Sequence, residues 1–166
     1  MTLLSLLFWL LVGGTFQVLM PAWRYMGQPA FPFVLAVVLY AAMSKKSRYF
    51  VIMALLGGIL EDSLSLAPLG FSGCALLAAG GVATLLRADF FTFRATAVSV
   101  LGAFCTAVAT GVMAILLHVK GLIVLTPAET GWRMLGSALL GAIVVPVMFR
   151  LMQALERRLG MREEMV

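Results

Sequence analysis

The stretch from Gly58 to Gly70, with the sequence GILEDSLSLAPLG, decides how many helices this chain forms. It interrupts a mostly apolar segment, residues 49–86, that is too long for one membrane helix of about 20 residues. Pro68 and Gly70 supply a turn, because proline and glycine are the strongest local markers of a break between periodic segments. The segment therefore predicts two shorter helices joined by a turn rather than one long helix.

Apolar runs on either side of this segment predict four more helices. No charged residue occurs between Thr2 and Ala22, and no Lys or Arg precedes the first run, so we expect an uncleaved first helix rather than a signal peptide. Pro146 falls inside the last run and predicts a kink there. The six expected helices are about Leu3 to Met20, from the Pro29 and Pro32 pair to Met43, Tyr49 to Leu66, Gly70 to Leu86, Ala95 to Leu117, and Met134 to Leu151.

The composition of the chain places these helices in a membrane. Hydrophobic residues make up 63% of the 166 residues and charged residues 11%, with a mean hydropathy of +1.08. A soluble domain of this size leaves much of its area in water and could not hide so much apolar surface, whereas a bilayer can. The predicted fold class is an all-α integral membrane protein with six transmembrane helices. It comprises one membrane domain, residues 1–152, and a short charged cytoplasmic tail, residues 153–166.

The distribution of Lys and Arg favours six helices over five, because cytoplasmic loops of membrane proteins carry an excess of these residues. With six helices and a cytoplasmic N-terminus, nine basic residues lie inside and three outside, whereas five helices would put five inside and seven outside. Both termini are therefore expected in the cytoplasm. Such short basic clusters contact anionic lipid headgroups, and we expect no nucleic-acid binding. The nine are Lys45, Lys46, Arg48, Arg87, Arg94, Arg150, Arg157, Arg158 and Arg162, and the three are Arg24, Lys120 and Arg133.

The sequence lacks the residues that enzyme chemistry needs. Its only histidine, His118, is expected at the outer end of the fifth helix as an interfacial residue, and no nucleophile lies beside a base. Metal-ligand clusters and nucleotide-binding fingerprints do not occur, so we expect no catalytic residue, metal or cofactor. Cys74 and Cys105 have neither CxxC spacing nor a nearby histidine. We interpret them as small buried thiols, and a disulfide between them stays an open alternative.

Glu61 and Asp62 are the one polar oddity near membrane depth. They come near the end of the third helix, where the helix dipole disfavours negative charge, so a compensating interaction is expected. The favoured interpretation is structural, with Asp62 accepting hydrogen bonds from backbone amides of the turn between Ser63 and Gly70. The alternative is that Asp62 binds a cation, a proton or a basic residue of a partner. Glu61 points about 100° away from Asp62 on a helix and need not share its role.

Small residues recur at a spacing of four on two of the expected helices, and such faces let membrane helices approach one another closely. We expect these faces to meet inside the bundle, with contact to a partner's helix as the alternative. They consist of Ala103, Ala107 and Gly111 on the fifth helix and of Ser137 and Gly141 on the last.

The stretch that separates the third and fourth helices also resembles the signature of a known family, the bacterial rod shape-determining protein MreD. Members of that family carry a helix of small residues, then an Asp, then a short segment that ends in Leu-Gly. Gly58, Asp62, Leu69 and Gly70 fall at matching places, with Pro68 just before the Leu-Gly pair.

Two further features are similar to that family. A proline-led second helix ends in Leu39-Tyr40 before a basic loop, and the last helix carries Pro146 and Phe149 and is followed by a basic tail. The chain departs from the pattern at Phe33, where the family often has a polar residue after the proline, so the role of that polar residue is in doubt here.

The resemblance implies a non-enzymatic scaffold of the cell-elongation machinery in the bacterial inner membrane. Such a protein would bind MreC, which has a single membrane helix, and would help to organise peptidoglycan synthesis. The wider complex contains MreB, RodZ, RodA and a penicillin-binding transpeptidase. The family's fold is similar to the S-component of energy-coupling-factor transporters, so the alternative function is a solute-binding subunit of a vitamin transporter. That alternative requires a polar, aromatic-lined pocket at the outer face, and the predicted outer loops are poor in Asn, Gln and Asp.

A scaffold that holds a partner's single helix needs a smooth groove that the partner can approach closely. Gly57 and Gly58 on the third helix and Gly73 on the fourth are the residues that we expect to form part of this groove.

Overall fold

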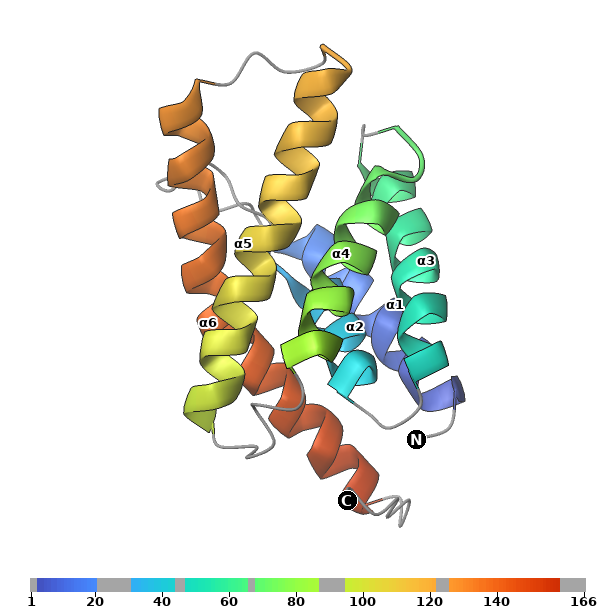
Figure 1. The fold of residues 1–166 in the computed structure, drawn as a ribbon. Coiled ribbons are helices and arrows are strands. Elements are labelled where there is room, and N and C mark those ends of the chain that lie inside the picture. The colour runs from blue at the N-terminus through green and yellow to red at the C-terminus, as the bar shows by residue number, and fades with distance from the viewer. Residues whose placement is uncertain are drawn as a thin grey trace.

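The structure is a computed structural model that describes residues 3–20, 31–43, 47–65, 68–86, 95–121 and 126–158. The described residues form six helices and no strand, so the all-α prediction is confirmed for them. Figure 1 shows the helices as a bundle whose neighbours along the chain run in opposite directions. In chain order they are α1 (Leu3–Leu19), α2 (Phe33–Met43), α3 (Ser47–Leu64), α4 (Phe71–Leu86), α5 (Ala95–Val119) and α6 (Pro127–Arg158).

The expected helix boundaries are close to the observed ones, except at both ends of α6. The expected start of the last helix at Met134 was wrong, because α6 already begins at Pro127 and includes Glu129 and Arg133. Thr126 and Glu129 form a reciprocal capping box: the Thr126 amide donates to Glu129 at 2.9 Å, and the Glu129 amide donates to the Thr126 hydroxyl at 3.4 Å. Proline at the first helical position needs no amide hydrogen there, so the sequence starts the helix earlier than its apolar run suggests.

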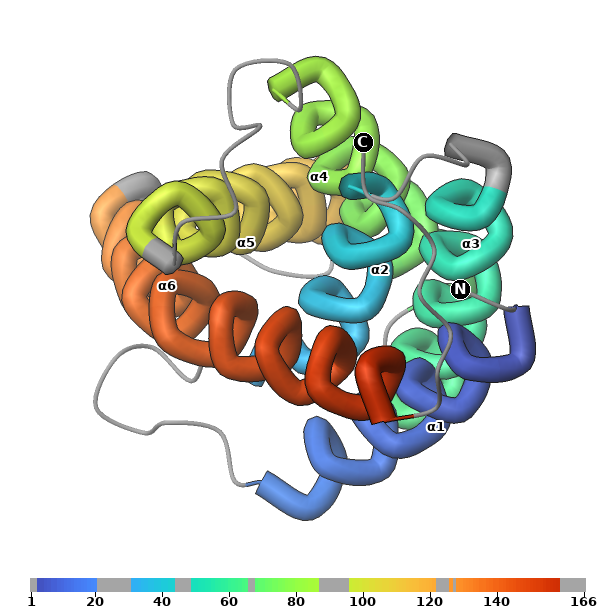
Figure 2. The backbone as a smooth tube through the Cα atoms, turned by 90° about the horizontal axis from the view of Figure 1, so that it is seen from below, coloured from blue at the N-terminus to red at the C-terminus, as the bar shows by residue number. Residues whose placement is uncertain are grey.

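At its other end α6 continues to Arg158, so the first residues of the predicted tail, 153–158, belong to the helix. The helix has 32 residues and is therefore about 48 Å long, more than the roughly 30 Å hydrocarbon thickness of a bilayer. Its two halves run in different directions (Figure 1), and Pro146 lies within it, as the expected kink requires. The C-terminal half crosses one end of the bundle beside α2 (Figure 2).

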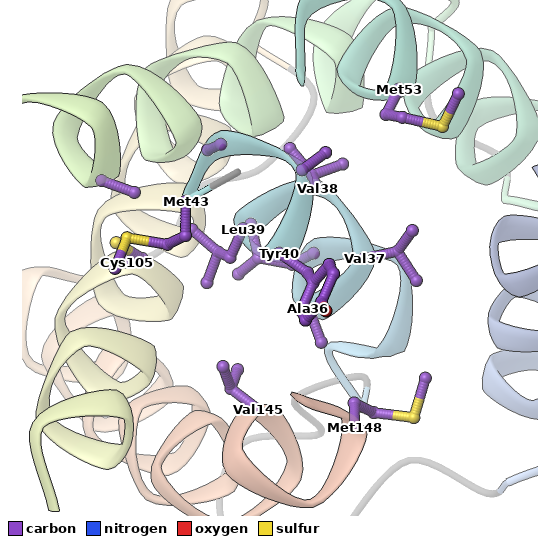
Figure 3. Close-up of a cluster of buried hydrophobic side chains, with 14 of the residues drawn as sticks. Ala36, Val37, Val38, Leu39, Tyr40, Met43, Met53, Cys105, Val145 and Met148 are labelled. Atoms are coloured by element: carbon purple, nitrogen blue, oxygen red, sulfur yellow. The ribbon is translucent and has the colours of Figure 1, made fainter. Parts of the chain in front are cut away.

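The short helix α2 is the centre of the bundle. Every residue from Val34 to Met43 is buried, as expected for a helix that is apolar on all sides. Figure 2 shows α2 enclosed by the other helices, and Figure 3 shows its side chains pointing outward in all directions, towards Met53 of α3, Cys105 of α5 and Val145 of α6. With 11 residues α2 is about 16 Å long, which is only half of a bilayer core.

The longest helices, α5 and α6, cross at a point of close backbone approach. A Cβ on Gly102 would lie 2.6 Å from the carbonyl oxygen of Gly141, and a Cβ on Gly141 would lie 2.7 Å from that of Gly102. The expectation that Ser137 and Gly141 pack inside the bundle is confirmed, since both are buried. On α5 the closest approach uses Gly102 and Thr106, each one residue before Ala103 and Ala107 of the expected face, whereas Gly111 of that face does pack inward against Met134 of α6.

Two helices, Thr96–Val119 and Ala128–Arg158, are long and apolar enough to cross a membrane by length and composition. The apolar helices α1, α2 and α4 are shorter. Of the two cysteines, Cys105 is buried as expected, but the prediction for Cys74 was wrong because its side chain is exposed. Both thiols are free, so the alternative of a disulfide between them is excluded in this structure.

Candidate functional site

The turn between α3 and α4 is held by the carboxylate of Asp62, which is only 3% exposed. Its Oδ2 accepts a hydrogen bond from the Gly70 amide at 2.5 Å, and its Oδ1 accepts one from the Ser72 amide at 3.1 Å. Asp62 lies near the C-terminus of α3, where negative charge is disfavoured, and the N-terminus of α4 compensates it with amide donors and the positive end of its dipole. The expected contact with the turn is therefore present at Gly70, and Ser72 in the first turn of α4 adds a second donor.

The backbone conformation at position 70 favours glycine. Its φ of +98° lies in the left-handed region, and its carbonyl accepts the first hydrogen bond of α4, from the Cys74 amide at 3.0 Å. The neighbouring motif residues Pro68 and Leu69 are exposed at the tip of the turn, and Leu69 is 74% exposed.

The glycines predicted to form a partner groove are mostly used inside the bundle, so that prediction was wrong for two of them. A Cβ on Gly58 would collide with the backbone of Gly73, so α3 and α4 touch at this pair. A Cβ on Gly57 would lie 2.8 Å from a side-chain carbon of Val34 on α2. Glycines let membrane helices approach one another closely. Here the helices that approach Gly57 and Gly58 belong to the chain itself. Gly73 alone keeps an open Cβ direction.

A second polar cluster joins α1, α2 and α3. The Gln17 amide donates from Nε2 to Glu61 Oε1 at 2.7 Å, and its Oε1 accepts a hydrogen bond from the Val34 amide at 3.3 Å. Gln17 therefore satisfies one of the amides that the first turn of α2 leaves without an intrahelical partner. Glu61 is partly buried, and no ion pair joins it to a basic side chain within the part of the chain that the structure describes.

Glu61 and Gln17 lie on the wall of a cavity of about 520 Å³. Because α2 is short, the other helices enclose space beyond its first turn, and Phe31, Pro32 and Val34 line that side. The volume falls within the range of roughly 300–1,000 Å³ typical of small-molecule sites. Most of the wall is apolar, and the polar residues that line it are Gln17, Glu61, Ser65, Ser72, Thr106, Thr110, Thr130, Arg133 and Ser137.

Three hydroxyl groups on the α5 and α6 sides of the cavity donate their hydrogens to their own helices. Thr106 donates to the Gly102 carbonyl at 2.8 Å, Thr110 to the Thr106 carbonyl at 2.9 Å, and Ser137 to the Met134 carbonyl at 2.9 Å. Such back-bonding is common for Ser and Thr inside membrane helices. Each hydroxyl oxygen keeps its acceptor capacity, so these residues offer acceptors rather than donors.

Arg133 lies on the α6 side of the cavity, in the second turn of that helix. Glu129 precedes it by four residues on the same helix, a spacing that places the two residues on the same face.

Sequence reasoning missed Gln17, Thr106 and Ser137 as members of one site. The sequence did contain a signal for Gln17: it is a polar side chain near the end of a first helix that carries no charged residue. Such side chains hydrogen-bond to neighbouring helices in membrane proteins. What the sequence could not show is how the other helices pack around the first turn of α2, which is what bounds the space. Among the residues that the structure describes, no group of three or more His, Cys, Asp or Glu side chains could hold a metal ion.

Comparisons with protein-family models, with curated proteins and with solved structures find no match for this chain.

Proposed function

We propose that this chain is a multi-pass membrane scaffold of the MreD type, which spans the bacterial inner membrane six times and holds the single membrane helix of an MreC-like partner. The wider partners would be RodZ, RodA and a penicillin-binding transpeptidase of the cell-elongation machinery. The observation that carries the proposal is the apolar outer surface of the bundle combined with its small-residue face on α4.

The outer surface is apolar on several helices. Along α6 the residues Leu135, Leu139, Ile143, Val147 and Leu151 are spaced by four and are each about half exposed or more. Such a stripe supports contact with lipid, because monomeric soluble proteins rarely expose contiguous apolar patches of this kind. Similar exposed residues occur on α1, α3 and α5, among them Leu4, Phe8, Leu11, Leu55, Ile59, Phe104 and Ile115.

The arrangement of the helix ends supports a cytoplasmic location for both termini. The start of α1 and the end of α6 lie at the same end of the bundle (Figure 1), as an even number of spans requires. Arg157 and Arg158 lie in the last turn of α6, at this end, in accordance with the excess of basic residues on the cytoplasmic side. The cavity then opens towards the outer half of the membrane.

A docking face for the partner helix is available on α4. Cys74 is exposed, Ala78 and Gly81 are partly exposed, and a Cβ on Gly81 would meet no atom within 4 Å. These three small residues are spaced by four and three, so they lie on one side of α4. Helix α4 itself lies between α3 and α5 (Figure 1). Small residues allow the close backbone approach through which membrane helices associate. This face replaces Gly57 and Gly58 as the proposed groove and adjoins Gly73.

Co-purification with an MreC-like protein from the same organism tests the proposal. Gly81→Leu and Ala78→Leu fill the proposed face without meeting the chain's own atoms at Gly81, so folding should persist while the yield of complex falls about tenfold or more. Ile143→Phe, on the outward stripe of α6, is the matched control and should leave the yield unchanged. A normal yield from both α4 variants would remove the docking face, and absence of any complex with the unaltered chain would remove the scaffold function.

Cysteine accessibility tests the proposed topology. In a background with Cys74→Ser and Cys105→Ala, single cysteines at Ser47 and Lys120 should be labelled from opposite sides of the membrane. Ser47 begins α3 at the proposed cytoplasmic end, and Lys120 follows α5 at the outer end. Labelling of both from the same side would contradict the six-span arrangement.

The cavity favours a second candidate function, a solute-binding subunit similar to the S-component of vitamin transporters. The polar residues within its mostly apolar wall, such as Gln17 and Glu61, are the feature that such a subunit needs. Nanomolar binding of a vitamin by the purified chain, without retention of an MreC-like partner, would favour this candidate over the scaffold.

A further inference from the structure

We propose that the cavity beyond the first turn of α2 binds a small organic molecule that carries an ammonium group on an apolar body, with Glu61 as its counter-charge. This ligand site goes beyond a scaffold function, which needs only the outer surface of the bundle.

The first ground for this proposal is the unbalanced charge of Glu61. Its neighbour Asp62 is compensated by two amides at the N-terminus of α4, whereas Glu61 receives one neutral donor, Gln17, on Oε1. The structure gives Oε2 no hydrogen-bond partner among the described residues, and the Glu61 side chain lines the cavity. A carboxylate in an apolar wall is costly unless it is paired, so a positively charged ligand would relieve this cost.

The second ground is that three hydroxyl groups of the wall offer acceptors. The hydroxyl groups of Thr106, Thr110 and Ser137 donate their hydrogens to backbone carbonyls. They therefore offer a ligand only their oxygen lone pairs. The Gln17 carbonyl is already occupied by the Val34 amide. An ammonium group has three donors and no acceptor, and it therefore matches these hydroxyl oxygens together with the Glu61 carboxylate.

The third ground is that the basic side chain among the described wall residues, Arg133, is not paired with the carboxylate. Arg133 belongs to α6 and Glu61 to α3, and these helices lie on opposite sides of the bundle (Figure 1). The structure gives no ion pair between Arg133 and Glu61 among the described residues, so the wall itself does not neutralise the Glu61 charge. Apolar side chains such as Leu60, Met113 and Leu117 cover the wall between them and suit an apolar ligand body.

Three probes that share one apolar body distinguish binding through the ammonium group from simple partitioning of the apolar body into the membrane. These are 2-phenylethylammonium, 2-phenylethanol and phenylacetate, titrated by calorimetry into the full chain in nanodiscs of uncharged (zwitterionic) lipid. We expect saturable binding of the ammonium compound, at least about tenfold tighter than that of the alcohol, and no saturable binding of the carboxylate. Equal uptake of all three, or uptake equal to that of empty nanodiscs, would overturn the proposal.

Two variants test the residues. Glu61→Gln keeps the size of the side chain and should weaken binding of the ammonium compound at least tenfold, while Glu129→Gln, an acid outside the cavity, is the matched control and should not. Ala114→Leu narrows the cavity and leaves the carboxylate in place, so it should weaken the ammonium compound and the alcohol alike. Unchanged affinity in Glu61→Gln would overturn the proposal.

Co-purification of the MreC-like partner distinguishes this proposal from the proposed function. Glu61→Gln should retain the partner at the normal yield, because the docking face on α4 is elsewhere. Loss of the partner in Glu61→Gln, with no binding of the small ammonium compound by the unaltered chain, would assign the cavity to a basic side chain of the partner instead and would overturn the small-molecule site.

Discussion

The hydroxyl of Tyr40 on α2 donates a hydrogen bond to Glu156 Oε2 near the end of α6, over 2.6 Å and across 116 positions of sequence. The Tyr40 ring also packs edge-on against Phe149, with ring centroids 4.9 Å apart. Because α6 is longer than a membrane span, its last turns reach across the end of the bundle and close it against the central helix (Figure 2). The contact therefore fixes the C-terminal half of α6, beyond Pro146, to the core.

Removing the Tyr40 hydroxyl should weaken the contact between α2 and the end of α6. Tyr40→Phe keeps the ring contact with Phe149 and removes the hydrogen bond to Glu156, so the free energy of unfolding should fall by about 1 kcal/mol. Unfolding in mixed micelles measures the loss. Glu156→Gln retains a carbonyl acceptor and should cost less than Tyr40→Phe. Equal stability of Tyr40→Phe and the unaltered chain would mean that the hydrogen bond contributes nothing.

Gly58 should tolerate no side chain. Its Cβ would meet backbone atoms of Gly73, which cannot rotate away, so Gly58→Ala should destabilise the chain by at least the roughly 1–3 kcal/mol of ordinary overpacking, and Gly58→Leu should prevent normal folding. Monodisperse yield in size-exclusion chromatography and thermal unfolding measure both. Gly81→Ala, where a Cβ meets nothing within 4 Å, is the matched control and should behave like the unaltered chain. A normal yield of folded Gly58→Leu would contradict the α3–α4 contact.

Asp62 should act through the backbone amides that it binds. Asp62→Ala leaves the Gly70 and Ser72 amides without their acceptor, and a buried unsatisfied donor costs about 1–3 kcal/mol, so the free energy of unfolding should fall by at least that amount. Asp62→Asn retains one oxygen and should cost less. Hydrogen exchange at the start of α4 locates the effect. Full stability of Asp62→Ala combined with loss of a cation-dependent activity would contradict the structural role.

The sequence predicts the helices well because each depends on local chemistry. Apolar runs, charged loops and the Pro68–Gly70 turn fix six helices to within a few residues, and the start of α6 was missed only because Thr126 and Glu129 were not interpreted as a capping box. The same local chemistry predicted that Asp62 would accept amides of the turn, as it does at Gly70.

The arrangement of the helices depends on pairs of distant residues, and there sequence reasoning was weaker. A glycine in a helix indicates close approach but not whether the neighbour belongs to the same chain, so Gly57 and Gly58 were assigned to a partner although α2 and α4 occupy their faces. The cavity depends on how the other helices pack around the first turn of α2 and on a contact between Gln17 and Glu61 across 44 positions. No periodicity in a single sequence encodes either feature.

The contact between Gly141 of α6 and Thr106 of α5 predicts a coupled effect of two substitutions. A Cβ on Gly141 would collide with the Thr106 side chain and would also lie 2.7 Å from the Gly102 carbonyl oxygen, so Gly141→Ala should be destabilising by roughly 1–3 kcal/mol. Thr106→Ala removes the colliding atoms and gives up only hydrogen bonds to carbonyls of its own helix, so alone it should cost less.

In the double variant the new methyl group occupies part of the space that Thr106 leaves, so the two losses should not add. We expect the double variant to be more stable than the sum of the single losses predicts, by roughly 0.5–3 kcal/mol, the range found for residues in contact. The Gly102 carbonyl keeps the rescue incomplete, because that backbone oxygen stays in the path of the new Cβ. Unfolding free energies of the four proteins measure the coupling, and additivity to within about 0.3 kcal/mol would mean that the two helices do not touch at this pair.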